Sequence, residues 1–379
     1  MKNLLLYYAT NRKHKGLDRF KPDLYETTFS DDGMENLRFG KVTLTADENE
    51  LAKYINITEK FGKGDGVGLS EYLTECAKSA RIEAFEEKLD PKISDIHQKK
   101  DAKFGSQAMF DELKKTMENK SDILIYIHGF NVSWHEAVGS ALSLQEMLNN
   151  SRVKDPAQNL LVILFTWPSN GQALPFVSYK SDRTDAQTSG YAFARGMLKV
   201  RDFLTTIKKN SGILCGQDIH LLCHSMGNYV LQSSLERIDQ FTPGTVLPRI
   251  FEHIFLCAPD VDDNVFEPGE PMGNLHELAR SVSIYHNKED KAMYVSDYTK
   301  GNPERLGTGG VARPSILHNK IQQINCSPLV QGEGFVEHSY YLSGYVNDDI
   351  RYSIDGVPHE DYKRRRTRDI SLPNVWRMK

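Results

Sequence analysis

The sequence of 379 residues lacks several features that would place it in other classes of protein. It has no apolar run near the ~20 residues of a membrane-spanning helix, so we expect no transmembrane segment. A formal net charge of −4 gives no positive excess for a phosphate backbone, and we expect no nucleic-acid partner. Hydrophobic residues at 39% and charged residues at 26% are typical of a soluble globular protein.

Cysteines are few and scattered. There are five, an odd number, and no pair has the spacing of metal ligands. Cys223, Cys257 and Cys326 lie in apolar runs, whereas Cys76 and Cys215 do not. This pattern favours reduced, buried thiols and a cytoplasmic location over a disulfide framework, and it implies no metal site.

Continuous apolar runs alternate with segments of helical periodicity. The runs predict strands at residues 4–10, 40–45, 123–129, 160–167, 251–256, 282–286 and 320–326, and one more leading into Ser225. Helices are predicted at residues 69–89, 108–117, 133–149, 185–207, 226–238, 275–280 and 292–298. The alternation predicts an α/β fold with a roughly eight-stranded, mostly parallel sheet and helices on both faces. We expect one domain over residues 1–379, with residues 47–120 as a charged, largely helical insertion or flanking subdomain.

Two polar segments resemble ligand-binding motifs only superficially. The glycine-rich run at residues 62–68 fits neither nucleotide-binding glycine fingerprint and predicts a flexible surface loop. The basic run at residues 363–366 is short, and a solvated surface explains it better than phosphate binding.

Ser225 lies between the end of an apolar run and the start of a helical pattern. Such a position is typical of a nucleophile elbow, a sharp strand-to-helix turn that needs small residues two places before and after the serine. Gly227 meets this requirement, and Cys223 is small enough to be compatible with it. The alternative is that Ser225 only caps the helix.

The residues that follow the other strands supply partners for a serine nucleophile. Asp290 follows the strand at residues 282–286, and His338 follows the last strand. A histidine is needed to take the serine proton, and a carboxylate to orient the histidine. Asp260 also follows a strand directly and stays open as an alternative acid. His224, next to Ser225, should point to the opposite face and serve in packing or hydrogen bonding.

An oxyanion needs preorganised donors. The backbone N–H of Met226 is one candidate, and the N–H of Phe130, in the turn after the strand at residues 123–129, is the other. His128 is predicted to hydrogen-bond within that turn. Arg183 and Asp185 are expected either at the rim of the pocket or at a solvated helix start.

Seven stretches together resemble a known family, the bacterial alpha/beta hydrolases of unknown function. They are Tyr-Ala-Thr-Asn-Arg at residues 8–12, His-Gly-Phe-Asn at 128–131, Trp-Pro-Ser at 167–169, His-Ser-Met-Gly-Asn at 224–228, Ala-Pro-Asp-Val-Asp at 258–262, Asp-Lys-Ala at 290–292 and His-Ser-Tyr-Tyr at 338–341. The resemblance implies the α/β-hydrolase fold and the triad Ser225, Asp290 and His338. It implies no substrate.

The expected activity is that of a serine hydrolase that cleaves a small-molecule ester or thioester through an acyl-enzyme on Ser225. No cofactor or metal is expected, and the oligomeric state stays open. Two alternatives remain: a lipase or phospholipase that acts at membranes, and a hydrolase-like binding module without catalysis.

Overall fold

The computed structural model describes residues 1–59, 61–87, 103–118, 121–151, 159–169, 175–211, 217–241, 247, 249–293, 304–329 and 338–379. Within these residues the main sheet has eleven strands, in the spatial order β14-β15-β13-β12-β11-β10-β8-β9-β1-β4-β7. They are β1 (Lys2–Thr10), β4 (Arg38–Ala46), β7 (Arg81–Ala84), β8 (Ser121–Ile127), β9 (Asn159–Thr166), β10 (Ile219–His224), β11 (Phe251–Cys257), β12 (Ala279–His286), β13 (Ile321–Asn325), β14 (Arg366–Arg368) and β15 (Val375–Met378).

The sheet is mostly parallel, as predicted. Every neighbouring pair from β15 to β1 is parallel, whereas β4, β7 and β14 run antiparallel to their neighbours. All eight predicted strands are present in this sheet. The expected count omits β7, β14 and β15, which have only three or four residues each and no apolar run. Two short hairpins, β2 (Arg12–Lys15) with β3 (Leu24–Phe29) and β5 (Thr58–Glu59) with β6 (Gly62–Lys63), lie outside the main sheet.

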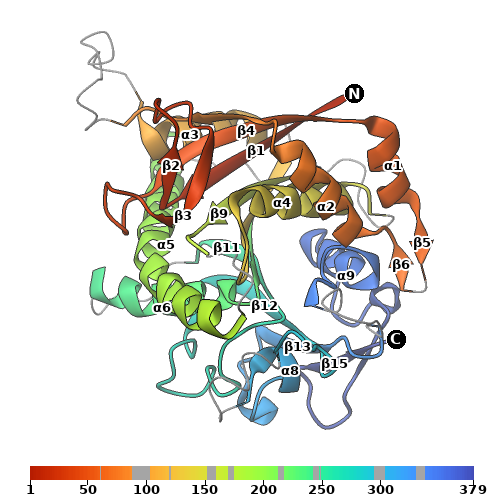
Figure 1. Ribbon diagram of the computed structural model, residues 1–379. Coiled ribbons are helices and arrows are strands. Elements are labelled where there is room, and N and C mark those ends of the chain that lie inside the picture. The colour runs from red at the N-terminus through yellow and green to blue at the C-terminus, as the bar shows by residue number, and fades with distance from the viewer. Residues whose placement is uncertain are drawn as a thin grey trace.

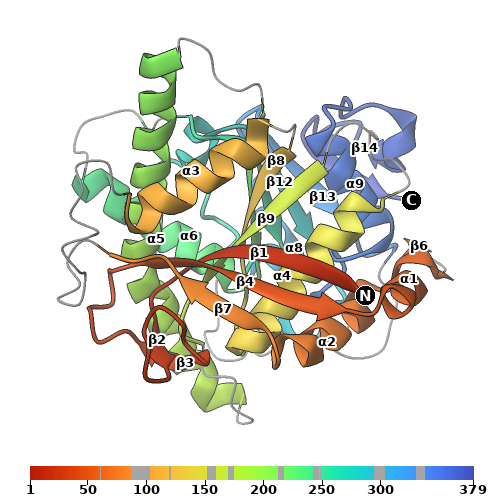
Figure 2. The same cartoon turned by 90° about the horizontal axis from the view of Figure 1, so that it is seen from above.

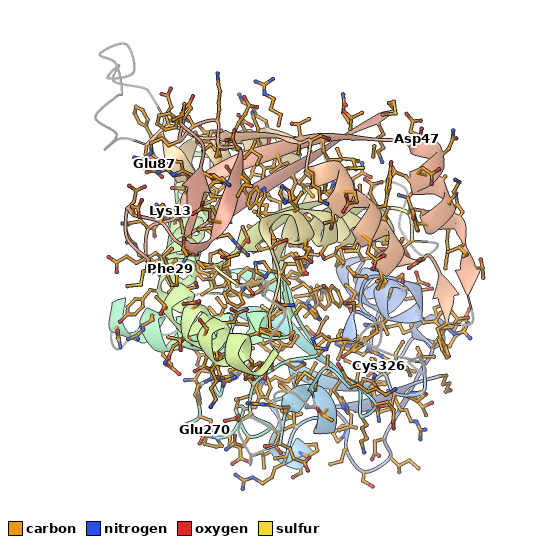
Figure 3. All side chains as sticks on the ribbon, in the orientation of Figure 1. Lys13, Phe29, Asp47, Glu87, Glu270 and Cys326 are labelled. Atoms are coloured by element: carbon orange, nitrogen blue, oxygen red, sulfur yellow. The ribbon has the colours of Figure 1, made fainter. Side chains whose placement is uncertain are left out.

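Helices cover both faces of the sheet (Figures 1 and 2). Helices α2 (Gly66–Ala77), α4 (Trp134–Asn149) and α9 (Gly344–Ile354) contribute to one apolar core cluster. Helices α3 (Gly105–Glu118), α5 (Pro175–Ser211) and α6 (Gly227–Phe241) contribute to the other. The shorter α1 (Glu48–Asn56) and α8 (Leu306–Gly309) complete the set among the described residues. Figure 3 shows side chains packed between the sheet and the helices on either side.

Helix α5 begins at Pro175, ten residues before the predicted start at Asp185. Asp182 is fully buried and Tyr179 nearly so. The buried face of these first turns is therefore polar, and it lacks the apolar periodicity by which a helix is recognised in a sequence. The helix predicted at residues 292–298 falls largely outside the described residues.

The charged segment at residues 47–120 is more than a helical insertion. The helix predicted over residues 69–89 is wrong beyond Ala77, where α2 ends. Strand β7 follows and pairs with β4 at the edge of the main sheet, with Ile82 opposite Val42. Ile82 and Ala84 are buried, so the alternation of apolar residues is real but only four residues long.

The glycine-rich run at residues 62–68 is a tightly packed contact, and its prediction as a flexible surface loop is wrong. A Cβ atom on Gly62 would lie 2.8 Å from Gly344 Cα, and one on Gly66 would lie 2.7 Å from the backbone of Leu342. Asp65 caps α2 by accepting a hydrogen bond from the N–H of Gly68. Glycine is needed here because two backbone segments nearly touch.

The basic run at residues 363–366 is partly buried, which corrects its prediction as a solvated surface. Arg364 Nε lies 2.7 Å and Arg366 Nη1 lies 3.3 Å from the fully buried carboxylate of Asp349 in α9. Tyr285, in β12, donates its hydroxyl to the same carboxylate at 2.7 Å. Burial raises the pKa of Asp349, but the two guanidinium groups outweigh burial and hold the pKa below its usual value.

We expect Asp349→Asn to lower the free energy of unfolding by about 3–5 kcal/mol, because two guanidinium groups would stay buried without their anion. Urea denaturation followed by circular dichroism measures the change. Asp369→Asn is the matched control, since Asp369 is exposed and only accepts backbone hydrogen bonds from residues 371 and 372. Equal stability of the two variants would contradict this role of Asp349.

Candidate active site

The carboxyl ends of the parallel strands meet at one edge of the sheet, and polar residues follow them there. Residues 128–131 follow β8, and Ser225 follows β10 directly. Asp260 comes shortly after β11 and Asp290 shortly after β12. In open α/β sheets this edge is where ligands bind.

Ser225 has the strained backbone of a nucleophile elbow, with a φ of 52°. Its N–H donates to Cys257 O at 3.0 Å, and its carbonyl accepts from the N–H of Asp260 at 3.2 Å. The buried amide of Asn228 donates to Cys223 O at 3.1 Å and to Ser225 O at 3.0 Å. These bonds hold the turn in a conformation that a serine would otherwise avoid.

Two glycines allow the turn after β8 to touch the elbow. A Cβ on Gly227 would lie 2.6 Å from Ile127 O and 2.7 Å from His128 O. A Cβ on Gly129 would lie 2.8 Å from Ser225 Cβ. The small residue expected two places after the serine is therefore required by backbone contact. Cys223, two places before it, is fully buried within the core cluster of α5 and α6.

The structure brings Asp290 and His338 together. His338 Nδ1 lies 2.7 Å from Asp290 Oδ2, and the Asp290 side chain is fully buried. The other oxygen of Asp290 accepts from the N–H of Ala292 at 3.1 Å. The Nδ1 proton of His338 is thus held by the carboxylate, so that Nε2 is available as a base. In the described residues the Ser225 hydroxyl makes no hydrogen bond, a common state of free enzymes.

His224 connects the elbow to His338. Its Nε2 lies 3.0 Å from the carbonyl oxygen of His338, and the two rings are 4.6 Å apart. A carbonyl only accepts, so His224 Nε2 carries the proton. Burial lowers the pKa of His224 well below its usual value. His224 therefore positions the segment that carries His338, in line with its predicted hydrogen-bonding role.

Asp260 is held by other groups. Tyr179 donates its hydroxyl to Asp260 Oδ2 at 2.8 Å, and Arg305 Nε lies 3.3 Å from Oδ1. Arg305 is fully buried and also pairs with Asp262 at 2.5 Å. The contacts of Asp260 thus lie with α5 and Arg305, while His338 contacts Asp290.

The N–H groups of Met226 and Phe130 donate no hydrogen bond within the part of the chain that the structure describes. The neighbouring Asn131 N–H is occupied, because it donates to Asp182 Oδ2 at 3.1 Å. The two predicted oxyanion donors therefore lie on turns that touch one another, and neither N–H is used by another group of the described residues.

His128 fixes the peptide that carries the Phe130 N–H. Its Nδ1 donates to Gly129 O at 2.9 Å, whereas its Nε2 accepts from the N–H of Trp167 at 3.3 Å. The carbonyl and N–H of a trans peptide point in opposite directions, so the Phe130 N–H points away from the His128 ring. Burial lowers the pKa of His128 well below its usual value, which keeps the ring neutral.

Arg12 is fully buried beneath the same turn. Its Nη2 donates to Val132 O at 2.7 Å and lies 3.4 Å from His128 Nε2, and its Nε donates to the hydroxyl of Thr166 at 2.9 Å. No carboxylate lies within ion-pair distance of Arg12 among the described residues. Burial lowers the pKa of Arg12 to about 9. Arg12 thus favours the His128 tautomer that orients the oxyanion peptide.

Sequence reasoning did not assign roles to Arg12, Tyr179, Asp182, Asn228 or Arg305. Arg12 and Asn228 belong to the stretches at residues 8–12 and 224–228 that carry the family resemblance, so their presence in those stretches was the available signal. Tyr179 and Asp182 are spaced to face one side of a helix. Nothing near Arg305 in the sequence indicates its burial.

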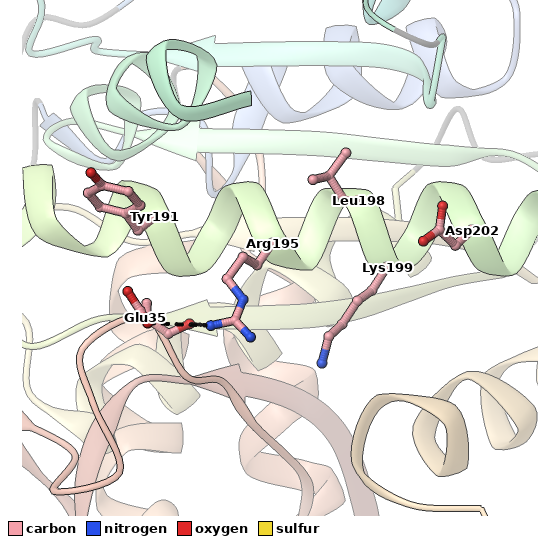
Figure 4. Close-up of a pocket in the computed structure, with 6 residues that line it drawn as sticks. All are labelled: Glu35, Tyr191, Arg195, Leu198, Lys199 and Asp202. Atoms are coloured by element: carbon pink, nitrogen blue, oxygen red, sulfur yellow. Dashed lines mark hydrogen bonds and ion pairs between the residues drawn. The ribbon is translucent and has the colours of Figure 1, made fainter. Parts of the chain in front are cut away.

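A hollow beside α5 is lined by Glu35, Tyr191, Arg195, Leu198, Lys199 and Asp202 (Figure 4). It includes none of the residues at the strand ends. The described residues contain no cluster of three or more histidine, cysteine or acidic side chains able to hold a metal ion. In the same residues, no helix has the length and apolar character needed to span a membrane.

A mostly parallel sheet with helices on both faces and a serine elbow after a central strand defines an α/β-hydrolase fold. A family model described as alpha/beta hydrolase of unknown function matches residues 103–346. The chain belongs to this family.

Among solved structures the chain shows a limited similarity to lipase B of Aspergillus fumigatus and to a peroxisomal alpha-beta-hydrolase of Saccharomyces cerevisiae. The lipase has a TM-score of 0.34 and 10% identity, over 64% of this chain and 54% of its own. The peroxisomal protein has a TM-score of 0.24 and 11% identity, over 71% of this chain and 47% of its own. This chain thus spans about half the length of each. No curated protein matches the chain.

We expect His128 and His224 to stay neutral in the folded protein through the pH range in which an ordinary histidine gains its proton, because burial above all lowers their pKa. Their tautomers should differ, with the proton on Nδ1 of His128 and on Nε2 of His224. Nitrogen NMR shifts, assigned with His128→Asn and His224→Gln, report both properties. The unfolded chain takes up protons first below about pH 6.5, so these histidines should lower stability as pH falls. A titration midpoint near 6.5 in either folded ring would disprove the assignment.

Proposed function

We propose that this protein is a serine hydrolase that cleaves a carboxylic ester or thioester through an acyl-enzyme on Ser225. The observation that carries the proposal is the 2.7 Å contact between His338 Nδ1 and buried Asp290, and it is supported by the strained elbow conformation of Ser225 and by the 3.0 Å contact of the neighbouring His224 Nε2 with His338 O. These residue types in this arrangement serve nucleophilic acyl transfer on several unrelated folds.

In the proposed reaction the Ser225 hydroxyl attacks the carbonyl carbon while His338 Nε2 takes its proton. Asp290 keeps the proton of Nδ1 in place and stabilises the imidazolium that forms. The tetrahedral intermediate then collapses, and the leaving alcohol or thiol receives the proton from His338. Water, activated by the same histidine, attacks the acyl-enzyme and releases the acid.

The negative charge of the tetrahedral intermediate would be met by the N–H groups of Met226 and Phe130. Support for this pair comes from their lack of other partners in the described residues and from the bond that His128 makes to Gly129 O. A hydrogen bond to the carbonyl polarises the peptide and strengthens donation by its N–H. Removal of one such donor costs about 10²–10³-fold in turnover in enzymes of this type.

The proposal predicts that a fluorophosphonate labels the wild-type protein at Ser225 and does not label Ser225→Ala. The reagent reacts only with a serine whose proton is removed by a neighbouring base. Mass spectrometry of the labelled peptide identifies the site. Ser339→Ala is the control, since Ser339 lies next to His338 but lacks the strained elbow backbone of Ser225. Equal labelling of wild type and Ser225→Ala would refute the proposal, and absence of labelling in both would favour a non-catalytic binding module.

The choice of acid is tested with Asp290→Asn and Asp260→Asn. We expect Asp290→Asn to lower turnover of p-nitrophenyl butyrate by roughly 10⁴-fold, because the amide would favour the wrong tautomer of His338. Asp260→Asn should chiefly lower the melting temperature, since buried Arg305 would lose part of its pairing. A larger loss of turnover in Asp260→Asn than in Asp290→Asn, measured on folded protein, would identify Asp260 as the acid that orients His338. Activation by lipid vesicles in the same assay would instead indicate an enzyme that works at membranes.

A further inference from the structure

A guanidinium group stands on the wall of the proposed site without a full set of partners. Arg183, in α5, lies over the ring of Tyr229, with 3.8 Å between its Cζ and the ring centroid. Its Nη1 donates to the Tyr179 hydroxyl at 3.4 Å. The side chain is 15% exposed, so it is largely enclosed but still reached by water.

Three contacts place this guanidinium beside Ser225. Tyr229 lies one helical turn after Ser225, near the start of α6. Tyr179 meets Phe130, which carries a proposed oxyanion donor, with ring centroids 5.7 Å apart. The carboxylate closest to Arg183 belongs to Asp260, whose N–H is bonded to Ser225 O. Helices α5 and α6 both follow strands at the carboxyl edge, and the contact of Arg183 with Tyr229 joins α5 to the start of α6.

Asp260 does not satisfy Arg183. The distance from Arg183 Nη1 to Asp260 Oδ1 is 3.9 Å, too long for a hydrogen bond. Asp260 is closer to Arg305, at 3.3 Å, and to the Tyr179 hydroxyl, at 2.8 Å. Arg305 is completely buried and cannot meet a ligand, whereas Arg183 is partly open.

The donors of Arg183 are mostly unused. A guanidinium has five N–H donors in a planar fork. In the described part of the chain only Nη1 of Arg183 has a hydrogen-bond partner. Nη2 and Nε have none among these residues, and neither of them is a fully buried atom. These donors are therefore accessible, and their fork matches the two oxygens of a carboxylate.

We propose that Arg183 forms an anion-binding subsite and that the substrate is an ester or thioester that also carries an anionic group, a carboxylate being the simplest. This inference rests on the proposed hydrolase function. The anionic group would bind the fork of Arg183 while the scissile carbonyl lies between Ser225 and the N–H groups of Met226 and Phe130. Tyr229 holds the guanidinium plane by stacking, which lowers the entropy lost on binding.

The test compares two esters of equal chain length, mono-p-nitrophenyl adipate and p-nitrophenyl hexanoate, with the hydrolysis seen with Ser225→Ala subtracted. We expect wild type to favour the anionic ester in kcat/KM by about tenfold or more, the size of one charge-assisted interaction. Arg183→Gln should lose this preference, and Arg183→Lys should keep part of it. Lysine keeps the charge but lacks the planar fork. In both variants the loss should appear mainly as a higher KM for the anionic ester, because the subsite binds the substrate away from the reacting carbonyl.

Arg237→Gln is the matched control. Arg237 also lies over a tyrosine, with 3.7 Å from its Cζ to the Tyr191 ring, and it is half-buried on α6 with Nη1 bonded to Gln240. It lies away from the strand ends, so this variant should keep the wild-type ratio of the two esters. Melting temperatures of all variants confirm folding.

The outcomes separate the two proposals. An equal ratio in wild type and Arg183→Gln, or a wild-type preference for the neutral ester, overturns the subsite while esterase function stands. Labelling of Ser225 without cleavage of either ester contradicts the substrate class in the same way. Failure of wild type to be labelled and to cleave either ester overturns the hydrolase proposal, and the subsite with it.

Discussion

The site depends on a place where two backbone segments nearly touch, the turn after β8 and the elbow that begins α6. The turn after β8 passes Gly129 against Ser225 Cβ, and Gly227 brings the start of α6 against the carbonyls of Ile127 and His128. Any side chain at either glycine would separate these turns. The separation would move the N–H of Phe130 away from the serine. Close contact at two glycines therefore sets the distance between the proposed nucleophile and the proposed oxyanion donors.

Around this contact lies a layer of buried polar groups whose hydrogen-bond roles are fixed by chemistry. Carbonyl oxygens can only accept, so His128 must carry its proton on Nδ1 and His224 on Nε2. Burial keeps both rings neutral, which makes them stable supports while His338 exchanges protons in the proposed reaction. Arg12 adds a positive charge beneath the oxyanion turn with no carboxylate in contact among the described residues. His128 and His224 thus keep one protonation state, whereas His338 changes its protonation in the proposed reaction, although all three are histidines.

The elements that could be predicted are those in which the same requirement, such as burial in the core, applies to several consecutive residues. Every residue of β10 is buried, and the strand appears as a largely apolar run, with His220 and His224 as its polar members, directly before Ser225. Strand β7 alternates over four residues and is too short to be recognised. The first turns of α5 face a polar site through Tyr179 and Asp182, and their pattern is not that of a core helix. Arg364 is buried by a carboxylate from α9, a partner that only the folded chain reveals.

The same limit applies to the site. The order of Ser225, Asp290 and His338 follows from which strand each residue succeeds, so these positions could be predicted. Asp290 is the acid that the family resemblance implies, with Asp260 as the open alternative. The engagement of Asp260 by Tyr179 and Arg305 could not be predicted, because these residues come from distant parts of the chain.

The topology of the sheet also bears on how the chain folds. Strand β1 lies inside the sheet, where Tyr7 faces Ile163, while β15 flanks β13 on the other side of the nucleophile strand. Strands from the first and last described residues therefore close around a centre formed by the middle of the chain. Such pairing joins segments that are far apart in sequence, and the loop-closure entropy must be overcome before the contacts form. Folding should be slow for this reason, with the exposed edge of the β8–β13 strands vulnerable to intermolecular pairing until β1 and β15 are in place.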